Sequence, residues 1–285
     1  MIQSMTGYGK SILQLPTKKI TIEIKSLNSK NLDLSVRVPA YYREKELEIR
    51  KRLAKVLERG KIDFSIYIEN NGTELTSNIN ANVVKEYMKQ LGEVHNADET
   101  ELLKMAIRLP DSLKTEREEL DEEEWAVISA GIDEALTKII TYRKDEGVSL
   151  KKDFEVRISN IENLLKKVIE LDPERVIQVK ERLKKGISEL ETKVDENRFE
   201  QELIYYIEKL DITEEKVRLK NHLDYFLKEL NSDQSNGKKL GFITQEIGRE
   251  INTVGSKSNF APMQKMVVQM KDELEKIKEQ NLNVL

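Results

Sequence analysis

The spacing of apolar residues changes once along this chain, and that change constrains the fold more than any other feature. In the first 70 residues, apolar and polar residues alternate in three short runs, at Ile20–Ile24, Leu34–Val38 and Ile62–Ile68. A period of two, rich in β-branched residues, predicts half-buried strands. Apolar residues at helical spacing predict a helix from about Tyr41 to Leu57, between the second and third strands.

Beyond Gly72 the apolar residues recur every three or four positions, which predicts helices. Proline suits the first turn of a helix, so Asp172-Pro173 predicts the start of a new one, and Gly147 predicts a weak point in the helix before it. The acidic run Glu116–Glu124 predicts a solvated loop. The expected helices are 82–91, 122–171, 173–197, 198–230, 240–252 and 262–280.

These periods predict an α+β fold, with an N-terminal mixed β-strand/helix domain followed by long helices and a C-terminal helical domain. We expect residues 1–155 to form the α+β domain with a helical extension, 156–197 a connecting helical arm, and 198–285 a helical catalytic domain. The final helix carries an apolar seam that predicts packing against another helix, either in the same chain or in a second subunit. That seam consists of Met263, Met266, Val267, Met270, Leu274 and Ile277.

Composition narrows the functional classes. The chain has no cysteine, which excludes disulfides and thiolate metal sites, and no apolar run approaches the roughly 18 residues of a membrane span. The N-terminus has no signal-peptide pattern, so we expect a cytoplasmic protein without a membrane partner. The net charge is −4, yet the first 70 residues hold fourteen Lys/Arg against eight Asp/Glu. A mildly acidic chain with a basic region can still attract phosphates locally.

The stretch Gly237–Lys257 is the part of the chain that most indicates a functional site rather than a purely structural helix. Glu246 and Glu250 are four residues apart on one helical face, and Arg249 falls on an adjoining face. Two such carboxylates can bind Mg²⁺ or Mn²⁺, and an arginine beside them can hold phosphate oxygens. The alternative is an ordinary charged helix face. Gly248 costs roughly 1 kcal/mol relative to alanine inside a helix, which indicates a close approach there.

The preceding helix holds a second polar set around His222. A histidine titrates near neutrality and can act as a general acid or base, but His222 can equally be a residue at the edge of the core. In the N-terminal part, Lys25–Lys30 and Arg59–Lys61 are basic turns that can grip a nucleic-acid backbone or be plain hairpin ends. Aromatic residues make up only 6% of the chain, so base stacking on a sheet is not indicated.

Several motifs resemble the bacterial YicC/YloC family. They are Ser4-Met5-Thr6-Gly7-Tyr8-Gly9, Ser26-Leu27-Asn28, Arg59-Gly60-Lys61, Arg143, Glu146-Gly147, Gly237-Lys238-Lys239-Leu240, Phe242, Gln245-Glu246, Arg249-Glu250-Ile251-Asn252-Thr253 and Gly255-Ser256-Lys257. The sequence departs from the family pattern at Ser29, which weakens a basic grip there, and at Ile247-Gly248, which leaves the carboxylates untouched.

The resemblance implies an endoribonuclease that acts on single-stranded RNA in RNA turnover, requires Mn²⁺ or Mg²⁺, and forms a ring-like homo-oligomer, a hexamer. No DNA partner is expected. The rival hypothesis is a non-catalytic RNA-binding adaptor that presents RNA to another nuclease. Both hypotheses need the basic residues, but only an enzyme needs the carboxylates.

We therefore assign three sets of candidate residues. The expected catalytic residues are Glu246, Glu250, His222 and Arg249. The expected metal ligands are Glu246, Glu250, Glu214 and Glu215. The expected RNA-binding residues are Arg218, Lys238, Lys239, Lys257, Gln245, Asn252, Ser256, Arg59 and Lys61.

Overall fold

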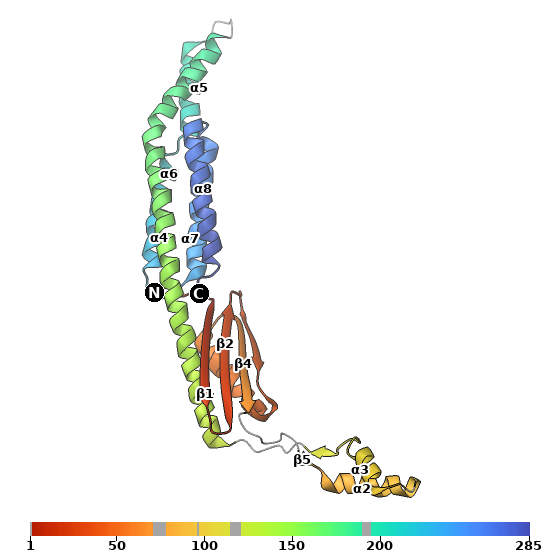
Figure 1. Ribbon diagram of the computed structural model, residues 1–285. Coiled ribbons are helices and arrows are strands. Elements are labelled where there is room, and N and C mark those ends of the chain that lie inside the picture. The colour runs from red at the N-terminus through yellow and green to blue at the C-terminus, as the bar shows by residue number, and fades with distance from the viewer. Residues whose placement is uncertain (1, 71–77, 96, 115–120, 190–194) are drawn as a thin grey trace.

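A computed structural model of the chain describes residues 2–70, 78–95, 97–114, 121–189 and 195–285. Its N-terminal part is a four-stranded sheet in the order β1-β2-β4-β3 (Figure 1). The strands are β1 (Gly7–Gln14), β2 (Lys18–Leu27), β3 (Leu32–Arg37) and β4 (Gly60–Asn70). The three predicted strands are confirmed as β2, β3 and β4.

Strands β3 and β4 are parallel, while β1–β2 and β2–β4 are antiparallel. The parallel pair is joined by a 3₁₀ turn (Ala40–Lys45) and helix α1 (Glu46–Leu57), so the predicted 41–57 helix begins with a tighter turn. Cross-strand pairing aligns Ile22 with Ile66 and Ile24 with Phe64 on one face. α1 and the first part of helix α4 share the core on this face.

Helix α4 (Glu122–Ser188) connects the two parts of the molecule (Figure 1). Its 67 residues make it about 100 Å long. The prediction that a new helix starts at Asp172-Pro173 is wrong, because α4 runs through Pro173 without a break. Buried Asp172 accepts from Arg175 on α4 at 2.8 Å and from Lys216 on α6 at 2.7 Å. These ion pairs stabilise the chain at the turn where proline removes a helix hydrogen bond.

Four helices follow: α5 (Glu196–Lys209), α6 (Thr213–Leu230), α7 (Gly237–Lys257) and α8 (Ala261–Asn281). The predicted 198–230 helix is two helices, because Asp211 accepts from the backbone N–H of Thr213 at 3.2 Å and so begins a new one. The apolar seam of α8 packs on α4 and α7 of the same chain. The core around the sheet ends at Ile139 of α4, and the second core begins at Leu150.

A small insertion lies between the sheet and α4. It contains β5 (Asn78–Ile79), α2 (Ala81–Val94), α3 (Glu99–Ala106) and β6 (Leu113–Lys114), with β5 and β6 antiparallel. Helix 82–91 is confirmed as part of α2. Most of the predicted acidic loop lies outside the described residues. No helix in the described part of the chain is long and apolar enough to cross a lipid bilayer.

The N-terminal residues pass close to α4 and pair with the C-terminus. The amide of Met5 donates to the carbonyl of Asn283 at 2.7 Å, and the amide of Leu285 donates to the carbonyl of Gln3 at 2.9 Å. Both termini therefore meet where the sheet joins the helices (Figure 1). A Cβ atom on Gly147 would lie 2.2 Å from the carbonyl oxygen of Ile2. Gly147 thus sits in an unbroken helix and permits this close approach.

We predict that Gly147→Ala destabilises the fold by about 1–3 kcal/mol, because the added methyl group collides with backbone rather than with a movable side chain. Gly186→Ala, in the same helix, is the matched control: no atom lies within 4 Å of its added Cβ. Alanine is a better helix former, so this control should be neutral or stabilising by up to about 1 kcal/mol. Urea unfolding measures both, and equal effects of the two substitutions would contradict the packing argument.

Candidate active site

Helices α6 and α7 are antiparallel neighbours, and two ion pairs cross between them. Glu215 on α6 accepts from Lys257 on α7 at 2.8 Å, and Glu229 accepts from Lys239 at 2.6 Å. Because one pair lies near each end, the two pairs fix the register of the helices. The Asn236 side chain caps the first turn of α7 by accepting from the Lys239 amide at 3.0 Å, so α7 begins three residues before the predicted start. We call the line of contact between these helices the α6–α7 seam.

His222 and Glu250 lie between the two ion pairs; counted from the Glu215–Lys257 pair they lie at one level of the α6–α7 seam, whereas from the Glu229–Lys239 pair they are seven and eleven residues away. His222 is seven residues from Glu215, and Glu250 is seven residues from Lys257. Seven residues are close to two helical turns, so each residue is on the same side of its helix as the charged group seven positions away. The rise of a helix puts this level about 10 Å from the Glu215–Lys257 pair.

Glu250 is buried without a partner. Only 5% of its surface is exposed, and within the described residues it makes no hydrogen bond or ion pair. The polar side-chain atoms that are fully buried without a partner belong, among the described residues, to Arg143, Glu215, Ser258 and Asn281, so the carboxylate oxygens of Glu250 keep contact with solvent. One turn earlier, the side chain of Glu246 is 50% exposed, with the 76%-exposed Arg249 at 4.0 Å. The predicted carboxylate pair therefore combines one buried and one accessible group.

The predicted metal ligands divide into two sets. Glu214 is exposed and pairs with Arg218, whereas Glu215 points into the bundle toward Lys257. Neither is joined to Glu246 or Glu250 by an interaction, and no three His, Asp or Glu side chains among the described residues converge as metal ligands. Mg²⁺ commonly takes one or two carboxylates together with waters and substrate phosphates. Glu246 and Glu250 fit a site of that open kind, and Glu214 and Glu215 fall outside it.

Two of the expected RNA-binding lysines are engaged within the protein. Lys257 donates to Glu215 and, at 2.9 Å, to the carbonyl of Asp211. Lys239 pairs with Glu229 and lies over the Tyr225 ring, 5.4 Å from its centre. The hydrogen bond to Glu229 raises the pKa of Lys239 above its ordinary value, and Tyr225 adds to that effect. Both lysines tie α7 to α6.

Most of the remaining polar residues of α7 lie on its exposed side, opposite the buried side chains, although Thr244 is buried. Within the described residues, Lys238 makes no ion pair. Phe242 also belongs to this face; it appears in the family-like motif but received no role from the sequence. We call this face the outer stripe of α7. Its members are Lys238, Phe242, Gln245, Arg249, Asn252 and Ser256.

Gly248 has a packing explanation. A Cβ atom there would lie 3.1 Å from a methyl group of Leu274 on α8. The close approach expected at Gly248 is therefore to a neighbouring helix of the same chain.

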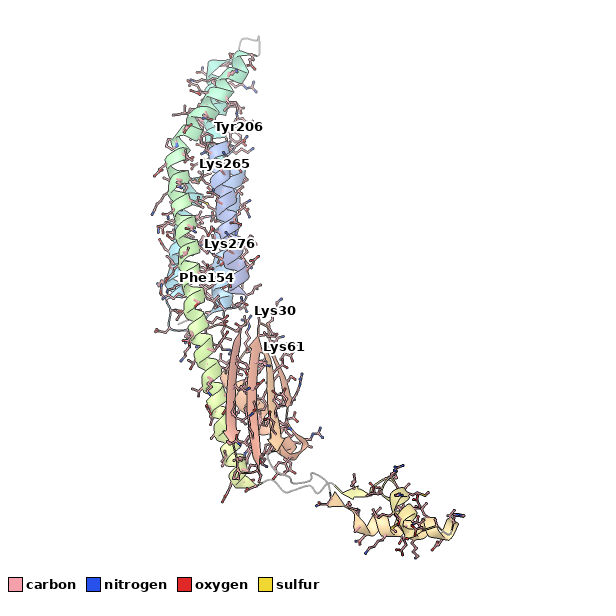
Figure 2. The ribbon with its side chains drawn as sticks, viewed as in Figure 1. Lys30, Lys61, Phe154, Tyr206, Lys265 and Lys276 are labelled. Atoms are coloured by element: carbon pink, nitrogen blue, oxygen red, sulfur yellow. The ribbon has the colours of Figure 1, made fainter. Side chains whose placement is uncertain are left out.

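The N-terminal basic turns lie at the end of the sheet nearest the C-terminal helices, where Figure 2 shows Lys30 and Lys61. Arg59 donates to the carbonyl of Ser29 at 3.1 Å, which joins the two turns, and Lys61 is exposed. Lys238 begins α7, at the end of the bundle where the chain termini meet. Lys257 is about 28 Å further along α7, so the expected RNA-binding residues are spread over the length of the helix.

Arg143 on α4 supports these turns. It is 2% exposed and donates to the Ser26 hydroxyl at 2.6 Å and to the carbonyls of Met5 and Leu57 at 3.3 Å. Burial lowers its pKa, with a smaller opposing effect from Glu58. The residues around Arg143 in the sequence do not indicate this burial, because the hydrogen-bond acceptors come from three distant segments.

Comparison with known proteins finds two matching family models. The model for the N-terminal region of YicC-like endoribonucleases matches residues 2–152, and the model for their C-terminal part matches residues 168–285. A probable endoribonuclease YicC from Clostridioides difficile is 32% identical over 293 residues, and one from Haemophilus influenzae is 30% identical over 297 residues. Both comparisons cover 100% of this chain and 100% of the relative.

We predict that Lys257→Met destabilises the protein by roughly 1–3 kcal/mol, because it leaves buried Glu215 without its cation. One oxygen of Glu215 already lacks a hydrogen-bond partner. The double variant Glu215→Gln, Lys257→Met should recover much of the loss. Lys238→Met, at the exposed end of the same helix, should change the unfolding free energy by less than about 0.5 kcal/mol. Equal urea midpoints for Lys257→Met and Lys238→Met would contradict a structural role for Lys257.

Proposed function

The chain belongs to the YicC-like endoribonuclease family, and on that premise we propose that it cleaves phosphodiester bonds of single-stranded RNA at the α6–α7 seam. The observation that carries this proposal is Glu250, a residue only 5% exposed that makes no ion pair or hydrogen bond within the described residues and, like His222 on α6, lies on the seam side of its helix. The ion pairs on either side of it compensate their carboxylates with lysines. A carboxylate without a partner in a line of paired ones is free to bind an incoming cation.

The side chains at this level supply the groups that RNA cleavage requires. One group must remove a proton from the attacking oxygen, and another must return a proton to the leaving oxygen. An imidazole can accept or donate a proton, so His222 can do either in combination with a glutamate. Arg249 is exposed beside Glu246 and can stabilise the charge that develops on the phosphate.

We propose that Glu246 and Glu250 hold a divalent metal ion, Mn²⁺ or Mg²⁺, when RNA is present. Such an ion would neutralise negative charge on the phosphate. Both ions prefer oxygen ligands, and the chain has no thiolate to offer. Glu214 and Glu215 are not part of this proposal, because each is committed to a cation of the protein.

RNA would reach the site along the exposed side of α7. Lys238 and Arg249 lie on the outer stripe of α7, and Lys30 and Lys61 extend the basic region onto the end of the sheet (Figure 2). Phosphate contacts of this kind give affinity without sequence preference. The proposed role is therefore general turnover of single-stranded RNA in the cytoplasm.

We predict that Glu246→Gln and Glu250→Gln each lose at least 100-fold in cleavage rate, while their RNA affinity stays within about threefold of wild type. The negative charge of each carboxylate is needed for the cleavage step but not for RNA binding. Glu214→Gln is the matched control, because this exposed glutamate pairs only with Arg218. A fluorescently labelled oligonucleotide, followed with Mn²⁺ and with EDTA, measures cleavage and binding together.

Full activity in Glu246→Gln or Glu250→Gln would remove the carboxylate assignment. Cleavage that survives EDTA would remove the metal proposal while leaving His222 as the acid or base. Tight RNA binding by the wild-type protein without any cleavage would favour the adaptor hypothesis.

We also propose that the protein is a homo-oligomer, a hexamer. The α8 seam does not support this, since it is buried within one chain. Support comes from α5, which leaves Ile204, Tyr205 and Tyr206 exposed at the far end of the bundle (Figure 2). Exposed apolar patches of this kind mark interfaces between proteins.

Light scattering of the purified protein should give six times the 33.1 kDa of one chain. Substituting Tyr205 and Tyr206 together by serine should reduce that mass, because it removes apolar surface from α5. A wild-type monomer at micromolar concentration would remove the hexamer proposal and leave the cleavage proposal standing.

A further inference from the structure

Phe242 is an exposed aromatic residue among polar neighbours on the outer stripe of α7. The chain has six phenylalanines, all in the described part of the structure. Phe64, Phe154, Phe226 and Phe260 are buried and Phe199 is half-buried, whereas Phe242 is 57% exposed. A single exposed apolar residue is common on protein surfaces, so its exposure alone indicates little. Its neighbours on the helix are what distinguish it.

Phe242 lies between two exposed cations, one without an ion pair in the described residues and one with a single long contact. Lys238 is four residues before it and makes no ion pair within the described residues, and Arg249 is seven residues after it with only a 4.0 Å contact to Glu246. Residues at these spacings share one side of a helix. Gln245, three residues after Phe242, is also exposed. The outer stripe of α7 therefore places an aromatic ring between a lysine, an amide and an arginine.

The end of α7 that carries Lys238 is also electrostatically unusual. Its first turn has no acidic residue and holds Lys238 and Lys239. Cations at the positive end of a helix dipole are unfavourable for the folded protein. A helix N-terminus attracts anions, and a lysine there adds to the attraction. Because Lys239 is already paired with Glu229, Lys238 is the lysine of this turn that an approaching anion can contact.

We propose that Phe242 is a base-stacking residue that holds one nucleotide of single-stranded RNA on the outer stripe of α7, while Lys238 and Arg249 contact the flanking phosphates. Every base has an aromatic face, so this contact orients the strand without selecting its sequence. From Lys238 to Arg249 the helix rises about 16 Å, a distance that a few nucleotides can span. Phe242 is here a positioning residue, because it would place the strand beside Glu246 and Glu250 without reacting with it.

This inference rests on the proposed function, and its test separates the two. Wild-type protein is first assayed for binding and cleavage of a labelled uridine oligonucleotide. Absence of both would overturn the proposed function and this inference with it. When the wild type binds and cleaves, the affinities of Phe242→Leu, Phe242→Tyr and Phe242→Trp decide the inference alone.

Phe242→Leu keeps an apolar side chain of similar size but has no aromatic face. It should bind the oligonucleotide on the order of tenfold more weakly, while Phe242→Tyr and Phe242→Trp should bind within about twofold of wild type. An oligonucleotide of abasic ribose phosphates should bind wild type and Phe242→Leu equally. Tyr67→Leu is the matched control, since Tyr67 is a 52%-exposed aromatic on β4, away from this helix; it should bind as wild type does.

Fluorescence gives an independent readout. The chain has one tryptophan, Trp125, which is buried in the sheet core. In Phe242→Trp, the added emission should be quenched by the uridine oligonucleotide and not by its abasic counterpart. Unchanged affinity of Phe242→Leu, an equal loss of affinity for abasic RNA, or unquenched Phe242→Trp emission at saturating RNA would each overturn the inference. A changed mass of Phe242→Leu in light scattering with unchanged RNA affinity would instead assign Phe242 to a contact between subunits.

Discussion

The close contact of helix α4 with the first residues of the chain is the constraint on which the rest of the structure depends. A Cβ atom on Gly9 of β1 would lie 2.1 Å from the carbonyl oxygen of Ala135, so the helix rests directly on the strand backbone. Ser11, on the same face, donates to Glu134 at 2.6 Å. Only very small side chains permit this approach, and Gly147 repeats it further along α4 toward Ile2. The N-terminal segment thus sets the position of the helix that carries both cores.

The candidate site inherits its geometry from that arrangement. The second core joins α4 to α6, α7 and α8, and within it the α6–α7 seam is held at both ends by buried or half-buried ion pairs. Because an ion pair joins the two helices near each end, the helices have little freedom to slide past each other between those pairs. Lys239 and Lys257, which the sequence predicts as RNA-binding residues, thus also hold together the two helices that carry His222 and Glu250.

Sequence patterns predicted the parts of this fold that local spacing determines. The sequence predicted strands β2, β3 and β4 from their alternation, and it predicted the shared helix face of Glu246 and Arg249 from their spacing. Both predictions depend only on residues that are near in sequence. β1 was missed because three of its inward positions are Gly7, Gly9 and Ser11 and only Leu13 is apolar, which gives no apolar alternation. Pro173 was misread because one of the two cations that pair with Asp172 is Lys216 of α6, 44 residues away. The commitment of Lys257 to Glu215 was hidden for the same reason: the partner is 42 residues distant.

Glu250 differs from the other two carboxylates of the α6–α7 seam, because no lysine in the described part of the chain faces it. Glu215 and Glu229 each face a lysine, so ordinary packing of two charged helices accounts for both. Between those two pairs α6 carries His222 rather than a lysine, and within the described residues neither His222 nor Glu250 makes an ion pair. A lysine within reach of Glu250 would occupy its carboxylate as Lys257 and Lys239 occupy theirs. Without such a lysine, the carboxylate of Glu250 stays available to an incoming cation, which is the role proposed for it.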